Sequence, residues 1–356
     1  MKVKVTVECD EITNEISRIF DYQFDGTSSF EPHRFKPIDY ETTLSDFSIG
    51  LIVGPSGSGK TTLLKDFGEE VKPTWYENKP IVSHFKDVDD AQNRLGAVGF
   101  NSIPSWMRPY HVLSNGEQFR ARLARQLDSN IVVDEFTSVI DRDVAKSCSN
   151  AISRYVKRNN LKNIVFSSCH YDIIEWLQPD WVFDTQTGNL TTRRYHRPDI
   201  VLEIQPCTTK AWTHFRHHHY LTGDLNTSSL CWITTWNGRL VGFLSSISMP
   251  SGTLKKAWRG HRTVVLPEFQ GLGIGARMTD ALGDIHLAEG KRFYTKTSHP
   301  RLGEYREKSD RWRPTSHNKK SRPDYKDITL SQKAFGVNNR HTDRVCYSHE
   351  YIGESK

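Results

Sequence analysis

The spacing of apolar residues along the chain predicts two α/β modules that follow one another. In the first module, the apolar stretches 50–53, 131–133 and 163–168 are separated by a glycine-rich loop and by helix-like and polar segments. Buried strands that alternate with helices are typical of a domain with a largely parallel sheet. Residues 181–184 and 189–192 predict a final pair of strands joined by a short turn.

A second alternation follows the basic stretch 193–198, which ends in a proline. We interpret this stretch as a linker, because proline cannot continue a strand ladder. The pattern beyond it predicts another compact α/β domain. Its expected strands are 200–204, 231–236, 239–246, 262–266 and 292–296, and its expected helices are 208–217 and 274–287. The predicted domains are therefore 1–195 and 196–356.

Composition agrees with two folded modules and indicates the cellular compartment. The chain has 356 residues, 36% of them hydrophobic, and no apolar run comes near the roughly 18 residues that a membrane span requires. The alternating start lacks the apolar core of a secretory signal, and the six cysteines form no C-x-x-C pair. We therefore expect a cytoplasmic protein with no membrane insertion, no disulfide framework and no zinc ribbon.

The glycine-rich loop of the first module has the pattern of a phosphate-binding loop. Gly54-Pro55-Ser56-Gly57-Ser58-Gly59-Lys60-Thr61 matches G-x-x-x-x-G-K-[ST] between a strand and a helix. Backbone N–H groups of such a loop converge on phosphates, the lysine reaches the β- and γ-phosphates and the threonine ligates Mg²⁺. An ordinary glycine turn before a helix is the alternative. The expected ATP-binding residues are Gly54, Ser56, Gly57, Gly59, Lys60, Thr61 and Thr62.

Two carboxylates follow the apolar strand 131–133. Asp134 is expected to hold the Mg²⁺ together with Thr61, and Glu135 is expected to polarise the attacking water. The strand is short, so this pattern becomes informative only beside the phosphate-binding loop.

Three further motifs lie in a fixed order around this strand. Leu113-Ser114-Asn115-Gly116-Glu117-Gln118 resembles the LSGGQ signature of the ABC ATPases. Ser138-Val139-Ile140-Asp141 resembles their D-loop, and Cys169-His170 resembles the segment with their switch histidine. A helix-capping or core histidine is the alternative for His170. We found no good match for the Q-loop glutamine, for which Gln92 is the nearest candidate.

The resemblance to ABC ATPases implies an ATP-dependent, head-to-tail homodimer. In that family the signature serine and the following amides contact the γ-phosphate held by the opposite subunit. Ser114, Gly116 and Gln118 would then complete a site in trans, with Glu135 and His170 acting in hydrolysis. Only about fifty residues separate Lys60 from Ser114, so the helical subdomain is expected to be small.

A second glycine loop lies between the expected strand 262–266 and helix 274–287. The stretch from Val264 to Ala276 resembles motif A of the GNAT acetyltransferases, which implies acetyl-CoA as cofactor and a GNAT acyltransferase fold. The residues at the motif positions are Gln270, Gly271, Gly273 and Gly275. A dinucleotide-binding loop or a simple helix start are the alternatives. In GNAT folds a splayed strand exposes an amide to the thioester carbonyl, here the N–H of Val264 or Val265.

Candidates for proton transfer in the second module are a tyrosine and a histidine cluster. Tyr305 lies where many GNAT enzymes keep a tyrosine that protonates the leaving thiolate, although Ser298 replaces the asparagine often found seven residues earlier. The run 217–219 contains three histidines, of which His218 represents the expected general base. The alternative is that Trp212, Phe215 and one histidine pack on the sheet while the other histidines face solvent.

The second half of the chain is basic. Residues 196–356 hold 25 Lys and Arg against 15 Asp and Glu, whereas residues 1–195 hold 23 against 27. Arginines and lysines alternate with Trp and Tyr near the end, a pattern that binds phosphates and stacks bases. Contacts with CoA phosphates or with solvent are the other interpretations. This module also faintly resembles the phage DNA-modifying Mom enzymes, and fusions of an ABC ATPase with a GNAT domain are typical of phages and prophages.

These observations predict a bifunctional enzyme. An ABC-type ATPase module would be coupled to acyl transfer from acetyl-CoA, with a nucleic acid or a nucleic-acid-associated molecule as acceptor. One alternative is an ATP-dependent nucleic-acid-binding protein whose second module does not catalyse transfer. The other is an ATP-gated N-acetyltransferase that acts on small molecules or proteins.

Overall fold

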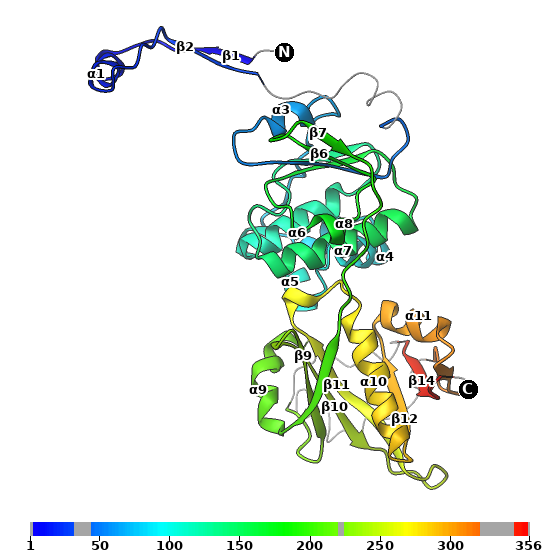
Figure 1. Ribbon diagram of the computed structural model, residues 1–356. Coiled ribbons are helices and arrows are strands. Elements are labelled where there is room, and N and C mark those ends of the chain that lie inside the picture. Colours follow the sequence, from blue (N-terminus) through cyan, green and yellow to red (C-terminus); the bar gives the residue numbers. More distant parts are fainter. Residues whose placement is uncertain (1–2, 32–43, 220–223, 321–344, 355–356) are drawn as a thin grey trace. The chain divides into compact units, whose positions relative to one another are not determined.

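The computed structural model describes residues 3–31, 44–219, 224–320 and 345–354 (Figure 1). The chain divides into two compact units. Unit 1 comprises residues 1–99 and 107–198, and unit 2 comprises residues 100–106 and 199–356. Within the described ranges, every helix is too short or too polar to cross a membrane. Both units contain mixed α/β sheets, as the hydrophobic pattern predicts.

Unit 1 begins with a hairpin around a helix. Strands β1 (Val3–Thr6) and β2 (Thr27–Phe30) pair antiparallel, and α1 (Glu11–Ile19) lies between them in sequence. Asp10 caps this helix by accepting the N–H of Thr13 at 2.8 Å.

A five-stranded sheet forms the centre of unit 1. Its order is β4 (Ile131–Val133), β5 (Ile164–Ser168), β3 (Ile49–Val53), β6 (Trp181–Asp184) and β7 (Asn189–Thr191). All neighbours are parallel except β6 and β7. Every residue of β3 and β5 is buried, which explains the apolar sequence of β3 and of the first three residues of β5. Gly50 lets β3 approach Trp181, because an added Cβ would lie 2.1 Å from the indole.

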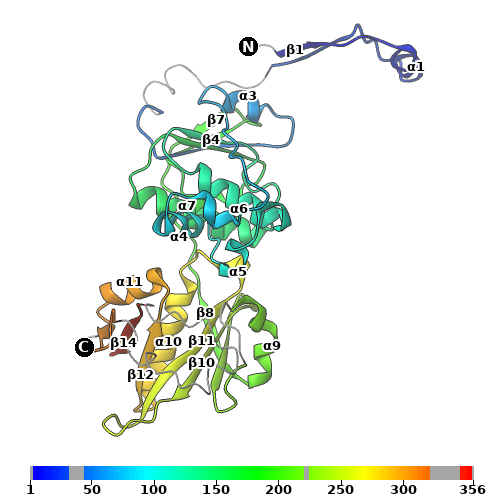
Figure 2. The same ribbon diagram turned by 180° about the vertical axis from the view of Figure 1, so that it is seen from behind.

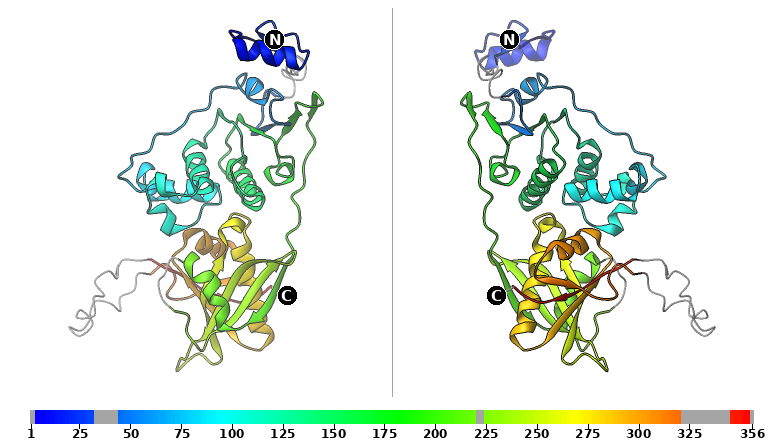
Figure 3. Two further views of the ribbon diagram at one scale, coloured as in Figure 1. Left: turned by 90° about the vertical axis from the view of Figure 1, so that its left-hand side faces the viewer. Right: turned by 90° about the vertical axis from the view of Figure 1, so that its right-hand side faces the viewer.

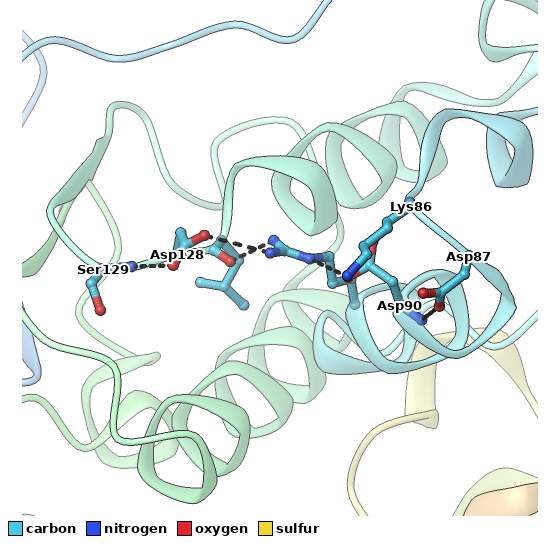
Figure 4. A network of polar contacts seen from close by, with 7 residues as sticks. Lys86, Asp87, Asp90, Asp128 and Ser129 are labelled. Carbon is cyan, nitrogen blue, oxygen red and sulfur yellow. Dashed lines mark hydrogen bonds and ion pairs between the residues drawn. The ribbon is translucent and has the colours of Figure 1, made fainter.

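Helices accompany this sheet. They are α3 (Lys60–Leu64), α4 (Val88–Ala97), α6 (Asn115–Gln126), α7 (Arg142–Arg158) and α8 (Ile174–Leu177), with 3-10 turns η1 (Ile81–His84) and η2 (Tyr110–Val112). Arg94 joins α4 to the end of α6, and Figure 4 shows two of its partners, Asp90 and Asp128. Its guanidinium donates to Asp90 at 2.8 Å, to the Leu127 carbonyl at 2.8 Å and to Asp128 at 3.5 Å. One side chain therefore ties two helices and the chain that leads into β4.

Unit 2 is built on a seven-stranded sheet (Figures 1 and 2). The strand order is β13 (Trp312–Pro314), β14 (Tyr347–Tyr351), β12 (Arg292–Thr297), β11 (Ala257–Val265), β10 (Arg239–Ser248), β9 (Leu230–Trp236) and β8 (Leu202–Cys207). Neighbouring strands are antiparallel except β11 and β12, which run parallel. The long strands β10 and β11 can be followed in the side views of Figure 3.

Two longer helices pack in unit 2. Helix α10 (Ile274–Ala288) contacts β10, β11 and β12, and α11 (Pro300–Lys308) contacts β12, β13 and β14. The expected helix 208–217 is confirmed as an unbroken run of helical turns, made of η3 (Thr209–Ala211), α9 (Trp212–Phe215) and η4 (Arg216–His218). Trp212 and Phe215 are buried against Phe243 of β10, with ring centroids at 5.4 and 5.3 Å. The two aromatic rings of this helical segment therefore pack on the sheet.

A short segment from the first half of the sequence belongs to unit 2. It is Phe100–Trp106, which contains the one-turn helix α5 (Ile103–Trp106). Phe100 and Trp106 are buried, and the indole N–H of Trp106 donates to the Phe100 carbonyl at 2.9 Å. Helix α5 lies beside the loop between β11 and α10 (Figures 1 and 2).

Candidate functional site

The loop between β3 and α3 has a backbone that only glycines adopt readily. Gly54, Gly57 and Gly59 have φ angles of 151°, 76° and 90°. An added Cβ at Gly57 would meet nothing within 4 Å, so the conformation and not crowding requires glycine there. Gly59 precedes α3 without a side-chain cap, which leaves the first N–H groups of the helix to other acceptors. Ser56 is exposed and Thr62 is half-buried.

The Lys60 ammonium lies against this loop. It donates to the carbonyls of Gly54 at 2.9 Å and Pro55 at 2.7 Å. A cation, uncapped N–H groups and glycines with positive φ are what a polyphosphate needs from a protein. These residues therefore fit the phosphates of ATP.

The two expected Mg²⁺ ligands are in direct contact. The Thr61 hydroxyl donates to Asp134 Oδ2 at 2.8 Å, and the Ser167 hydroxyl donates to the other oxygen of the same carboxylate. No group of three or more His, Cys, Asp or Glu side chains in the described residues could hold a metal ion. Mg²⁺ would therefore rest on Thr61, Asp134 and phosphate oxygens, the coordination it commonly takes beside nucleotides.

Glu135 and His170 both follow strands at this edge of the sheet. The backbone of Glu135 has a φ of 49°, and its N–H donates to Asp134 at 2.9 Å. The ring of His170 contacts the hydroxyl of buried Thr137 at 3.2 Å. The backbone N–H of His170 donates to the Ser168 hydroxyl at 3.1 Å. Burial, together with the nearby Arg142 guanidinium, lowers the pKa of His170 and favours the neutral imidazole.

The structure adds a residue that the sequence did not single out. Thr185, at the end of β6, is buried and lies 2.5 Å from the Ser58 hydroxyl of the phosphate-binding loop. Its own hydroxyl donates to the Val53 carbonyl at 3.0 Å. An added Cβ at Gly54 would lie 1.9 Å from Thr185 Oγ1, so this contact also explains why Gly54 is glycine. No local signal predicts a contact across 127 residues.

The signature segment forms the start of α6. Ser114 caps this helix: its hydroxyl accepts the Glu117 N–H at 3.4 Å, while the Glu117 carboxylate accepts the Ser114 N–H at 3.1 Å. Gln118 donates to the carbonyls of Tyr110 and Leu113 and so fixes the approach to the helix. Gly116 packs on Ile140 of the D-loop-like segment. Ser114 is exposed, and Gln92, the Q-loop candidate, lies in α4.

The second glycine loop joins β11 to α10. Gly271 and Gly273 have φ angles of 98° and 81°, and Gly273 precedes α10 without a side-chain cap. An added Cβ at Gly275 would lie 3.4 Å from a methyl group of Val265, so the helix approaches the strand closely here. The Gln270 side chain donates to the Val265 carbonyl at 3.0 Å. A 15-residue helix that begins at an uncapped glycine fits a pyrophosphate.

This loop lies where two parallel strands separate. Strands β11 and β12 pair only from Ala257 to Arg259, although β11 continues to Val265. The N–H of Leu266 donates to the carbonyl of Val241 in β10, and alternate N–H groups of a strand point to opposite edges. The N–H of Val264 therefore faces β10, whereas that of Val265 faces the edge from which β12 has diverged.

Tyr305 lies in α11 and donates its hydroxyl hydrogen to Asp280 of α10. Burial and the Asp280 carboxylate raise the pKa of Tyr305, so its proton is retained at neutral pH. The indole of Trp312 donates to the same carboxylate at 2.8 Å. The buried Arg306 guanidinium lies 4.8 Å from the Trp312 ring, and burial lowers its pKa to about 10.

The three histidines of residues 217–219 differ in their surroundings. His217 and His218 lie in η4 and are exposed, whereas the His219 ring lies 5.7 Å from that of buried Trp212. A fourth histidine that the sequence did not indicate, His261 of β11, accepts the Asn226 N–H at 3.4 Å. Burial, with added repulsion from nearby arginines, lowers the pKa of His261 to about 4.

Comparisons with known proteins concern mainly the second unit. The family model described as the acetyltransferase (GNAT) family matches residues 197–306. No curated protein matches the chain. The solved structure of an IAA acetyltransferase from Bacillus cereus is 15% identical, with a TM-score of 0.32, over 42% of this chain and 99% of that protein. The ribosomal-protein-S18-alanine N-acetyltransferase from Escherichia coli is 14% identical, with a TM-score of 0.30, over 44% and 97%.

A third solved structure is a dimeric ATP-binding cassette in a post-hydrolysis state with ADP and Pi. It is 14% identical, with a TM-score of 0.33, over 41% of this chain and 85% of that protein. TM-scores this low support no conclusion about fold or function, so the assignment depends on the family model alone. The C-terminal part of the chain contains a GNAT acetyltransferase domain.

Proposed function

We propose that the protein is a bifunctional enzyme of the cytoplasm. Residues 1–195 would form an ABC-type ATPase that dimerises on ATP, and residues 196–356 would transfer an acyl group from acetyl-CoA. The observation that carries the transferase proposal is the uncapped glycine loop before α10, placed where β11 and β12 diverge. The match of residues 197–306 to the GNAT family supports it.

Each step of transfer has a candidate group in this chain. The N–H groups of Gly271, Gly273 and Gly275 would hold the pyrophosphate of acetyl-CoA, and the Val265 N–H would polarise its thioester carbonyl. The acceptor amine forms the new bond to the acyl carbon as the carbon–sulfur bond breaks. The proton lost by the amine would go to a histidine, with His218 as our candidate. The leaving sulfur would gain a proton from Tyr305 once its hydroxyl leaves Asp280.

In the ATPase module, the contact between Thr61 and Asp134 carries the proposal. These two groups would hold Mg²⁺, while Lys60 would bind the phosphates and Glu135 would orient the attacking water. Ser114, exposed at the start of α6, would reach the nucleotide of a second copy in an ATP-dependent homodimer. His170 would contact the γ-phosphate from the same side as Glu135.

We propose a nucleic acid or a nucleic-acid-associated molecule as acceptor. The charge of the second module supports this, because residues 196–356 hold 25 Lys and Arg against 15 Asp and Glu. An excess of positive charge attracts the phosphates of nucleic acids. The resemblance to phage Mom enzymes points to the same class of acceptor.

The test begins with a calorimetric titration of CoA into the full chain. Wild type is expected to bind, and Gly273→Glu is expected not to bind, because the new side chain strains a backbone with φ of 81° and adds a negative charge beside the pyrophosphate. Gly252→Glu is the matched control, since a Cβ there meets nothing within 4 Å. Wild-type protein that does not bind CoA would contradict the transferase proposal.

The acceptor is sought next. Mass spectrometry would compare DNA, RNA and proteins from cells that express wild type or Gly273→Glu, and an acyl mark present only with wild type would identify the acceptor class. CoA binding without acyl transfer, together with salt-sensitive binding of nucleic acid, would favour a nucleic-acid-binding protein with a non-catalytic second module. A mark confined to proteins or small molecules would favour the ATP-gated N-acetyltransferase.

The ATPase module is tested by Mg²⁺-dependent phosphate release. Lys60→Ala and Glu135→Gln are expected to abolish hydrolysis, whereas Lys65→Ala, an exposed lysine at the end of α3, should leave it unchanged. Glu135→Gln should still bind ATP and elute as a dimer when ATP is present. Hydrolysis that survives Lys60→Ala would contradict the proposal.

A further inference from the structure

The segment Phe100–Trp106 follows a residue that is attached to helix α6. Immediately before it, the carbonyl of Gly99 accepts a hydrogen bond from the Arg120 guanidinium at 3.4 Å. Arg120 is buried in α6, and its Nε also donates to the Gly116 carbonyl in the first turn of that helix. The residue that precedes the segment is therefore attached to the helix that carries the signature motif.

The segment itself contacts the loop proposed to bind acyl-CoA. The N–H of Asn101 donates to Oε1 of Gln270 at 3.2 Å. The amide nitrogen of the same Gln270 side chain donates to the Val265 carbonyl at 3.0 Å. Gln270 thus bridges Asn101 to the end of β11, three residues before Gly273.

The segment is closed by hydrogen bonds of its own. Its indole–carbonyl bond between Trp106 and Phe100 is buried, the N–H of Trp106 donates to the Ser102 carbonyl at 3.1 Å, and the hydroxyls of Ser102 and Ser105 lie 2.9 Å apart. A contiguous series of bonds therefore runs from the first turn of α6 to the loop before α10. Coupling between two sites requires such a physical connection and a difference in energy between the states of each site.

We infer that Phe100–Trp106 couples the acyl-CoA site to nucleotide binding, with Asn101 as a positioning residue for the Gln270 side chain. This inference rests on the proposed function. Nucleotide that engages Ser114 and the first turn of α6 shifts Arg120 and the Gly99 carbonyl. The altered position of Asn101 then changes its hydrogen bond to the Gln270 side chain, and with it the affinity of the loop for CoA.

The experiment measures binding in the full chain. The Kd of CoA is determined by calorimetry without nucleotide and with saturating Mg²⁺ and a non-hydrolysable ATP analogue. Wild type is expected to show at least a roughly fivefold change in this Kd, within the usual range for coupled sites. Because linkage is reciprocal, CoA should change the Kd of the ATP analogue by the same factor.

Two variants interrupt the series of bonds at different points. Asn101→Pro removes the N–H that donates to Gln270, and Trp106→Phe removes the indole N–H but keeps an aromatic ring. Each should bind CoA and the ATP analogue separately while the ratio of CoA Kd values moves toward one. Pro104→Ala, at an exposed position of the same segment, is the control and should keep the wild-type ratio.

The outcomes separate this inference from the proposed function. Wild type that does not bind CoA would overturn the proposed function and the inference with it. Wild type that binds CoA with a Kd unaffected by the ATP analogue would overturn the inference alone. An unchanged ratio in folded Trp106→Phe and Asn101→Pro would also overturn it.

Discussion

Replacement of Asp280 is expected to destabilise unit 2 more than any other single carboxylate change on α10. The carboxylate is 2% exposed and accepts hydrogen bonds from Tyr305 and Trp312. Its negative charge also raises the pKa of buried Arg306 against the effect of burial. A hydrogen bond to a charged group contributes about 1.5–3 kcal/mol, and an uncompensated buried charge costs about 3–5 kcal/mol. Asp280→Ala should therefore cost about 3–5 kcal/mol.

Two comparisons separate the charge from the hydrogen bonds. Asp280→Asn keeps an acceptor for Trp312 but loses the charge, so about 1.5–3 kcal/mol is expected. Asp284→Ala is the matched control on the same helix, because that carboxylate is 55% exposed and accepts one hydrogen bond, from Tyr351 at 2.7 Å. It should cost about 1 kcal/mol.

Hydrogen–deuterium exchange of peptides from α10 and α11 gives the opening free energy of this region directly, even when the two units unfold separately. If Asp280→Ala lowers that free energy no more than Asp284→Ala, the buried network does not stabilise the unit and the reasoning is wrong. Asp280→Asn and Asp280→Ala of equal cost would show that the charge alone matters.

Gly283→Ala should destabilise unit 2 by about 1–3 kcal/mol in urea, although alanine is the better helix former by about 1 kcal/mol, because a Cβ would lie 2.2 Å from the buried Tyr351 ring. A stabilised variant would contradict this. Burial lowers the pKa of His286 to about 4, below the 6.5 of the unfolded chain, so protonation of the unfolded state should reduce stability by up to about 3 kcal/mol as the pH falls from 6.5 to 4. A His286→Phe variant with the same pH dependence as wild type would refute that origin. Arg94→Met should lower the exchange protection of α4 and α6 by about 1–2 kcal/mol, while Lys162→Met, which breaks an exposed ion pair, should cost less than about 1 kcal/mol.

The elements that sequence reasoning predicted well are those fixed by nearby residues. Residues 50–53 lie in β3 and all but the first of residues 163–168 lie in β5, because their apolar residues suit strands buried on both faces. The capping box of Ser114, which the sequence analysis did not identify, is also a local feature, a serine followed three residues later by a glutamate. The expected helix 208–217 is confirmed by the helical turns of residues 209–218.

Contacts between distant residues could not be predicted from one sequence. Thr185 meets the phosphate-binding loop across 127 residues, and Asn101 meets Gln270 across 169. Neither Thr185 nor Asn101 lies in a local sequence pattern that distinguishes it from any other polar residue. The burial of His261 could not be predicted from the sequence. By contrast, the alternative that one histidine of 217–219 packs while the others face solvent agrees with His219 beside Trp212 and exposed His217 and His218.

The sequence by itself determined where the two glycine loops form, because a strand, a set of glycines and a helix start are properties of a few consecutive residues. It also determined that the chain alternates strands and helices in both halves. Only the tertiary structure decided that Val265 and not Val264 turns its N–H to the open edge of β11, and that Phe100–Trp106 folds with unit 2. Strand register and the packing of distant segments depend on which surfaces meet, and that is a property of the whole folded chain.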